Sequence, residues 1–376
     1  MRLRRKAAVK KTEPKDLDYI VLLVTIILLG IGLVMVFSAS AASSNEPPRE
    51  DMYYYLRRQG FWSVLGLLSM FIMSKFNYWK IKKVALALTA INIFLLAAVY
   101  IPGVGIVINK ARRWIVIGGF TFQPSEVSKL AIIIFTAWFL AKRQHNMHNF
   151  FKTSFIPLAI MGISFVFILA QPDLGTALVI AAATFILLII AGMPFLQVAF
   201  FGLLGSSFAF YLMMNEPYRK KRLLAFINPW EDPLDTGYHI IQSLLALGPG
   251  GLLGMGLGRS RQKLWFLPEP QNDFIFAIIG EELGFIGTST ILILFFILLW
   301  RGFKIAMQAP DAFGSLLAAG ITTMIGLQVI INIGVVTGSL PVTGINLPLI
   351  SAGGSSLFVT LTSIGILLNI SKHVKI

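Results

Sequence analysis

The sequence predicts an all-α polytopic membrane protein with ten transmembrane helices. Hydrophobic residues make up 56% of the chain and charged residues only 13%, whereas soluble domains carry about 25% charged residues. The apolar residues are grouped into runs of about 17–25, the length that crosses a bilayer as a helix. Short segments rich in Lys and Arg recur on one side of these runs, which places both termini in the cytoplasm. The composition excludes a soluble enzyme.

The ten spans follow from the apolar runs in chain order. We expect them at about residues 19–39, 59–74, 84–102, 123–142 and 153–170, then two within 174–214, and the last three at about 273–299, 314–336 and 355–371. The run 174–214 lacks Asp, Glu, Lys and Arg, but as one helix it would be about 60 Å long, twice a bilayer. We therefore divide it at Gly-Met-Pro (192–194).

We treat the chain as one membrane domain, residues 19–371. A basic cytoplasmic tail (1–18) precedes it, a short cytoplasmic tail (372–376) follows it, and a large extracellular loop (215–272) separates the seventh and eighth spans. The net charge of +15 is explained by basic loops beside anionic lipid, so we expect no nucleic-acid partner. Cysteine is absent, which excludes disulfides and thiolate metal sites, and we predict no protein metal site.

Asp273 is the strongest candidate for a catalytic residue. It follows Pro268 and Pro270 and stands where the apolar pattern of the eighth span begins. A carboxylate at a helix N-terminus is stabilised by the helix dipole, so a structural role also accounts for it. At the outer membrane face the same carboxylate can act as a general base.

Three further charges fall inside predicted spans. Glu281 and Glu282 would lie about 12 Å deeper than Asp273 in a regular helix, where a carboxylate must be protonated or paired. Lys129, in the fourth span, is the partner that we expect for them. Lys129 also lies three residues after Glu126, on the same helix face.

The outer segments offer charged groups that could bind an anion. The cluster YRKKR (218–222) is either a solvated charge run or a clamp for a phosphate or pyrophosphate. Asp173 either caps a helix or joins the outer cluster. The glycines of 248–258 match no nucleotide-binding motif, and they favour close backbone packing or a segment that re-enters the membrane.

Six motifs spread over nearly the whole chain resemble a known family. They are ARRWI (111–115), QPSE (123–126), QPDLGT (171–176), NPWEDP (228–233), LPEPQNDFIFAIIGEELG (267–284) and PVTGINLPLISAGGSS (341–356). Together they are similar to the SEDS family (FtsW, RodA and SpoVE) of bacterial cell-wall synthesis, and most like its FtsW and SpoVE branch. Ala352 stands where many relatives have Tyr, and Asn272 where many have Thr.

The resemblance implies a glycosyltransferase that polymerises lipid II into peptidoglycan at the outer face of the bacterial cytoplasmic membrane. It implies a septal role in cell division or sporulation, a class B penicillin-binding protein as transpeptidase partner, and other divisome or sporulation membrane proteins nearby. The family's essential acid falls on Asp273. We expect the substrate to contact a second set of residues, namely Lys129, Glu126, Trp114, Arg113, Asp173, Arg219, Arg222, Lys263, Glu269 and Ser355.

Two functions of other classes stay open at this point. A lipid II flippase would use intramembrane charges such as Lys129, Glu281 and Glu282, although no inverted repeat is evident. A non-catalytic scaffold for partner synthases would not need Asp273. No cofactor is demanded, and a divalent cation (Mg²⁺ or Mn²⁺) at the pyrophosphate is compatible with the sequence. The sequence does not decide between division, sporulation and elongation, nor the oligomeric state.

Overall fold

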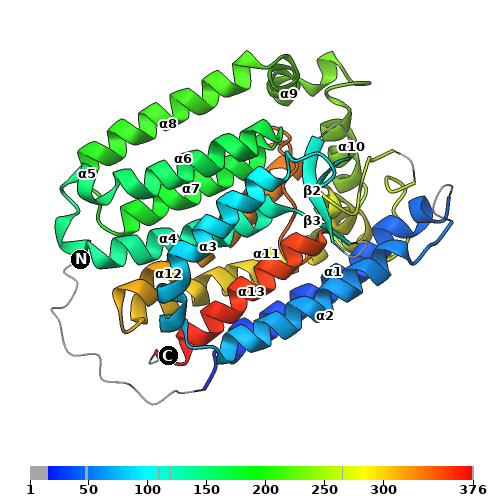
Figure 1. Cartoon of the computed structure of the whole chain (residues 1–376). Helices are drawn as coiled ribbons and strands as arrows, with labels where there is room; N and C mark the ends of the chain where they lie inside the picture. The colour runs from blue at the N-terminus through cyan, green and yellow to red at the C-terminus, as the bar shows by residue number, and fades with distance from the viewer. Residues whose placement is uncertain (1–15, 47–49, 109–110, 118–119, 265, 375–376) are drawn as a thin grey trace.

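Long apolar helices run alongside one another, with a small β-sheet and short helices at one end (Figure 1). The computed structural model describes residues 16–46, 50–108, 111–117, 120–264 and 266–374. Most of the predicted N-terminal tail (1–15) and the last two residues lie outside this description. The start of α1 and the end of α13 lie at the same end of the bundle, where the Asp18 amide donates to Ser371 Oγ (3.1 Å).

The long helices are α1 (Tyr19–Ser44), α2 (Tyr54–Lys75), α3 (Tyr78–Ala98), α4 (Pro124–Lys142), α6 (Phe155–Ala170), α7 (Leu174–Ile190), α8 (Phe195–Asn215), α11 (Ile275–Gln308), α12 (Ala312–Val336) and α13 (Gly354–Ser371). The short elements are β1 (Gly105–Ile108), β2 (Ala111–Ile117), β3 (Phe120–Phe122), η1 (Gln144–Asn146), α5 (Phe150–Thr153), α9 (Pro217–Ile227), η2 (Pro229–Glu231) and α10 (Tyr238–Leu247).

Each predicted span overlaps a helix, although several bounds differ: α3 spans Tyr78–Ala98 and not 84–102, and α11 continues to Gln308. Not every helix is by itself a candidate for crossing a membrane. Among the described residues, seven helices are long and apolar enough: α1, α3, α4, α8, α11, α12 and α13. Helices α6 and α7 are apolar but have only 16 and 17 residues, and α2 is less apolar. The ten-span count and the sidedness of the loops therefore stay predictions.

Local sequence accounts for the helix boundaries. Asp18 and Asp173 cap α1 and α7 by accepting from backbone amides of the first turn. Pro124 occupies the first turn of α4, where its missing N–H is harmless. The predicted division of 174–214 is confirmed, because α7 ends at Ile190 and α8 begins at Phe195, with Gly192 at φ +101° between them.

The all-α prediction missed one element. The segment after α3 forms a three-stranded antiparallel sheet, β1-β2-β3, rather than a loop. Its residues are rich in Ile and Val, which favour strands. In β2 the residues Arg112 and Trp114 pair with consecutive residues of β1, so Arg113 is the extra residue of a β-bulge.

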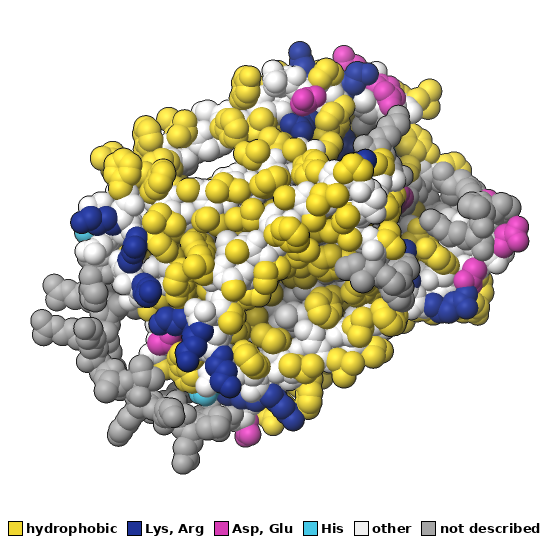
Figure 2. All heavy atoms as spheres, viewed as in Figure 1, with side chains coloured by type: hydrophobic (Ala, Val, Ile, Leu, Met, Phe, Trp, Pro, Cys, Tyr) yellow, Lys and Arg dark blue, Asp and Glu magenta, His cyan; other side chains and the backbone are white. Residues whose placement is uncertain are grey.

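Burial is uneven across the bundle. Helices α4, α12 and α13 are buried along most of their length, whereas no residue of α8 is buried. Helix α8 runs along the edge of the bundle beyond α6 and α7 (Figure 1). Apolar side chains cover the broad face seen in Figure 2, and Lys and Arg gather toward the ends of that view. This distribution is that of a protein whose sides face lipid.

Helix α11 is broken at Gly284, whose φ and ψ of 65° and −162° are not helical. The loop after α10 fills the break. The amides of Met255 and Gly256 donate to the carbonyls of Glu281 and Glu282, and the amides of Phe285 and Ile286 donate to Gly251 and Leu252. We call residues 248–258 the wedge. Gly254 lies so close to α11 that a Cβ atom there would stand 2.2 Å from the Glu282 carbonyl oxygen.

The wedge yields a first prediction, on stability. Gly254→Ala forces a methyl group into the backbone of α11, and it also strains a residue at φ +79°. Gly258→Ala is the matched control, because Gly258 has the same φ of +79° but open space around it. We expect Gly254→Ala to lower the unfolding midpoint in detergent by several degrees more than Gly258→Ala. Equal midpoints for the two variants would contradict close packing of the wedge.

Candidate active site around Asp273

Asp273 lies two residues before the start of α11, with Phe274 between them. Its backbone carbonyl accepts a hydrogen bond from Asn332 Nδ2 of α12 (2.8 Å), and the same Nδ2 donates to the carbonyl of Ile345 (2.8 Å). Gly344, at φ +73°, lies beside the carboxyl group, since a Cβ atom there would stand 3.3 Å from Asp273 Oδ2. Asn332 thus joins Asp273 to the loop between α12 and α13 (337–353).

This loop and α12 hold residues 271–273 in place through hydrogen bonds. The Ser351 hydroxyl donates to the carbonyl of Asn272 (2.7 Å), and the amide of Ala352 donates to the carbonyl of Gln271 (2.8 Å). Gln59 of α2 donates in turn to the Ser351 carbonyl (3.1 Å). These bonds fix the backbone carbonyls of residues 271–273, so the chain that bears Asp273 is held in one place.

Charged side chains surround the half-buried Asp273 carboxyl group. Its pKa is raised to about 6, chiefly by burial and also by Glu269 and Asp173, while Arg222 and Arg113 oppose the rise. Among the described residues, no hydrogen bond reaches this carboxyl group. It is therefore a base that can ionise near neutral pH and has accepting capacity to spare.

Arg113 and Asp173 meet at the start of α7. Arg113 Nε donates to the carbonyl of Gln171 (2.8 Å), and its Nη1 lies 4.0 Å from Asp173 Oδ2. Asp173 caps α7 by accepting from the Thr176 amide (3.1 Å), and Gln123 Nε2 donates to its other oxygen (3.2 Å). The β-bulge at Arg113 aims this side chain at the site. Arg222, on α9, reaches the same loop through the Val342 carbonyl (3.4 Å).

Lys129 does not pair with Glu281 or Glu282, and that expectation was wrong. Its Nζ lies 2.7 Å from Glu126 Oε2, one turn away on α4, and donates to Gln328 Oε1 of α12 (2.8 Å). All three side chains are buried. Gln328 is one helical turn from Asn332, so this charged pair connects through α12 to the Asp273 segment.

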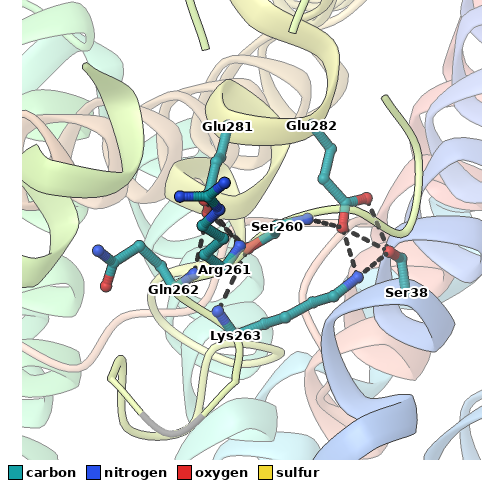
Figure 3. Close-up of polar contacts among 7 residues, drawn as sticks. All are labelled: Ser38, Ser260, Arg261, Gln262, Lys263, Glu281 and Glu282. Atoms are coloured by element: carbon teal, nitrogen blue, oxygen red, sulfur yellow. Dashed lines mark hydrogen bonds and ion pairs between the residues drawn. The ribbon is translucent and has the colours of Figure 1, made fainter. Parts of the chain in front are cut away.

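The partner of Glu282 is Lys263, which we had expected to bind substrate. Lys263 Nζ lies 2.6 Å from Glu282 Oε1 and 3.1 Å from the hydroxyl of Ser38 on α1 (Figure 3). Glu281 accepts from the amides of Arg261 and Gln262 and from the Ser260 hydroxyl (Figure 3). The buried Lys263 ammonium is thus already engaged away from Asp273, because Glu282 needs a cation.

The structure brings together only part of the predicted set. Asp273, Glu269, Asp173, Arg113 and Arg222 form one electrostatic cluster. Arg219 instead contacts the Leu212 carbonyl and the Tyr218 hydroxyl, and Ser355 is buried in the first turn of α13. Trp114 lies next to Arg113 on β2 and is half-buried.

Sequence reasoning missed four polar residues of this region. Asn332 and Gln328 stand as isolated amides in the apolar run of α12, which was an available signal. Gln123 was noted only as part of a helix start. His239 of α10 stacks on Phe274, with ring centroids 5.7 Å apart, and burial lowers its pKa. Across the described residues, no group of three or more His, Cys, Asp or Glu is arranged to hold a metal ion.

The fold and the cluster define a polytopic membrane protein with a polar site in which a half-buried carboxyl group lies in the field of two guanidinium groups. Residues 19–376 match the family described as "Cell cycle protein", which groups FtsW, RodA and SpoVE. The chain belongs to this family, which confirms the resemblance drawn from its motifs.

Relatives and solved structures agree with this assignment. The stage V sporulation protein E of Bacillus subtilis is 49% identical over 97% of this chain and 98% of its own length. A probable peptidoglycan glycosyltransferase FtsW of Geobacter metallireducens is 43% identical over 100% of this chain and 99% of its own length. A chain of a peptidoglycan synthase complex superposes with a TM-score of 0.77 at 30% identity, covering 94% and 97%. The rod shape determining protein RodA of Thermus thermophilus superposes with a TM-score of 0.68 at 29% sequence identity, and the match covers 94% of this chain and 96% of that chain.

The buried pair on α4 yields a second prediction. Removing one partner leaves an uncompensated buried charge, so Glu126→Gln or Lys129→Met alone should destabilise the fold by about 3–5 kcal/mol. The double variant should recover part of this loss, because the pair is removed as a unit. Unfolding in detergent measures the three changes. Losses that simply add in the double variant would show that the two charges are not coupled.

Proposed function

We propose that this chain is a peptidoglycan glycosyltransferase that polymerises lipid II at the outer face of the cytoplasmic membrane, during division or spore formation. The observation that carries the proposal is the Asp273 carboxyl group. It is half-buried, its pKa is raised to about 6, and it lies in the field of Arg113 and Arg222. Two classes of group needed for the transfer of a diphosphate-linked sugar, a base and cations, are therefore adjacent.

In the proposed reaction Asp273 accepts the proton of the acceptor sugar's 4-hydroxyl group. That oxygen attacks C1 of the donor sugar, and the bond from C1 to the polyprenyl pyrophosphate breaks with inversion. The leaving pyrophosphate carries away the bonding electron pair. One base and one good leaving group suffice, so a second catalytic carboxylate is not required.

Arg113 and Arg222 are the groups proposed to stabilise the leaving pyrophosphate. A guanidinium group offers several fixed donors that match phosphate oxygens. Both arginines act on Asp273 electrostatically, so both stand where negative charge develops. Glu269 and Asp173 add negative charge to the cluster, and Arg219 would contact the pyrophosphate from one turn before Arg222 on α9. No step is assigned to a divalent cation.

The polyprenyl tail of the substrate would lie in lipid along α8. No residue of α8 is buried, and apolar side chains such as Phe200 and Leu203 are exposed. Helix α9 follows α8 after a single residue and carries Arg222. A polyprenyl tail lying in lipid beside α8 would therefore lead to the charged cluster.

A class B penicillin-binding protein is the proposed partner. The superposed chain of the peptidoglycan synthase complex comes from an assembly that couples polymerisation and crosslinking. The proposal extends that coupling to this chain, together with a septal location. Other membrane proteins of division or sporulation would complete the assembly.

The central prediction concerns Asp273→Asn, which keeps shape but removes the base. Purified protein with a cognate class B penicillin-binding protein is fed labelled lipid II, and glycan length is read on a gel. We expect polymer from the wild type and a loss of at least about 100-fold in the variant, the range of general-base contributions. Asp235→Asn is the matched control, because Asp235 is an exposed acid of the same loop outside the cluster.

The outcomes separate the proposal from its rivals. Wild-type rate in Asp273→Asn would refute the role of the base. No polymer from the wild type, with the partner and with Mg²⁺ or Mn²⁺ supplied, would refute the glycosyltransferase itself. A vesicle translocation assay would then test the flippase, and its failure would leave the scaffold.

The pH dependence is a further prediction. Only ionised Asp273 accepts a proton, so the rate should rise with pH through about 6 and then level off. Glu269 raises this pKa and Arg222 lowers it. Glu269→Gln should therefore move the acidic limb to lower pH, and Arg222→Gln should move it to higher pH. Shifts of the same sign in both variants, measured under subsaturating substrate, would contradict Asp273 as the titrating group.

A further inference from the structure

The wedge (248–258) belongs to the predicted extracellular loop, yet its surroundings are not those of an aqueous loop. Residues 236–258 contain no Asp, Glu, Lys or Arg. Leu252, Leu253 and Leu257 are exposed, and they adjoin the exposed Phe285 and Ile286 of α11. An apolar surface of this kind marks a binding face rather than a solvated loop.

Two contacts between α1 and α11 give the depth of the wedge. At one end Arg301 pairs with Asp18 (2.8 Å), and at the other end Glu282 accepts from Ser38 (2.7 Å). The two contacts are 20 residues apart on α1 and 19 apart on α11, which is about 30 Å of helix, the thickness of the hydrocarbon core. The ion pair and the Glu282 network therefore mark its two boundaries.

The wedge lies just inside the second boundary. It is bonded to Phe285 and Ile286, which follow Glu282 by three and four residues toward Arg301, or about 5 Å of helix. Segments that insert into a membrane interface reach a depth of about 5–10 Å. Arg259 and Arg261 follow the wedge directly and are exposed, so they would stand at the level of the lipid head groups.

Backbone polar groups of the wedge find hydrogen-bond partners within the protein, as a segment in hydrocarbon requires. Irregular chain tolerates membrane depth only where its polar groups are satisfied by protein. Gly251, Leu252, Met255 and Gly256 all exchange backbone hydrogen bonds with α11. The nearby charges are also satisfied inside the protein: Lys263 pairs with Glu282, and Glu281 accepts hydrogen bonds from Ser260 and two backbone amides.

We propose that the wedge is a re-entrant segment whose leucines are covered by the acyl chains of the leaflet on the Asp273 side. The lipid-facing side of α11, which includes Ile293 and Phe296, continues directly into the wedge through Phe285 and Ile286. Lipid is the occupant because this surface has no charge to match a water-soluble partner. The proposal does not depend on the catalytic activity.

Cysteine labelling tests the proposal, since the chain contains no native cysteine. Leu253→Cys reports the wedge, and Leu234→Cys is the matched control. These leucines are 78% and 89% exposed in the same predicted loop, but Leu234 lies between Asp232 and Asp235. The protein is placed singly in lipid nanodiscs, which leave both faces accessible, and is treated with a sulfonated maleimide. Maleimides react with the thiolate, which does not form in hydrocarbon.

We expect Leu253→Cys to react at least about tenfold more slowly than Leu234→Cys, with equal labelling of both after denaturation in SDS. Leu257→Cys should behave like Leu253→Cys. Rates within twofold of each other would overturn the proposal. A wild-type unfolding midpoint for each variant establishes that the fold is intact.

A second measurement identifies what covers the wedge. A bimane fluorophore on each cysteine is followed in nanodiscs made with brominated acyl chains, which quench by contact. Quenching at position 253 and not at 234 supports lipid. Slow maleimide labelling without quenching would mean that protein covers the wedge, which would also overturn the assignment.

Discussion

The rule that hydrocarbon imposes on a polypeptide underlies the architecture around α11: every backbone polar group must find its partner within the protein. Helix α11 breaks this rule locally at Gly284, where helical hydrogen bonding is interrupted. The wedge restores it through four backbone hydrogen bonds on the two sides of the break. Gly254 and Gly284 are required there because a Cβ atom at either position would collide with backbone.

The break has a consequence for Asp273. The first half of α11 becomes a short rod, with Asp273 before one end and Glu281 and Glu282 at the other. The carboxylates of the two glutamates bind residues 260–263, while Asn332 and Ser351 hold residues 272 and 273. The segment that bears Asp273 is thus fixed at both ends. A base can be placed within a fraction of an ångström only by such supporting contacts.

The sequence predicted what depends on local chemistry. The apolar runs, the break at 192–194, the cap at Asp173 and the position of Asp273 before a helix all follow from neighbouring residues. The partners of buried charges did not follow, because Lys263 and Glu282 are brought together by the wedge, and Lys129 and Gln328 by packing of α4 on α12. The sheet was missed because its short strands fall in a segment assigned as a loop by hydropathy alone.

Two kinds of charge in this protein can be told apart by how completely they are paired. Lys129, Lys263 and Arg301 are buried, and each has a carboxylate within 2.8 Å. In each pair the charge is already neutralised by its partner, so removing one member leaves a buried charge unpaired. Asp273 differs, since no described residue donates to its carboxyl group and its arginine neighbours act on it without a close ion pair. Its raised pKa follows from this incomplete pairing, because burial penalises the charged form and no donor compensates. A site that receives a proton and an anionic leaving group needs a carboxylate and cations that are not already paired with each other. Of the charged clusters described, the one around Asp273 meets this requirement.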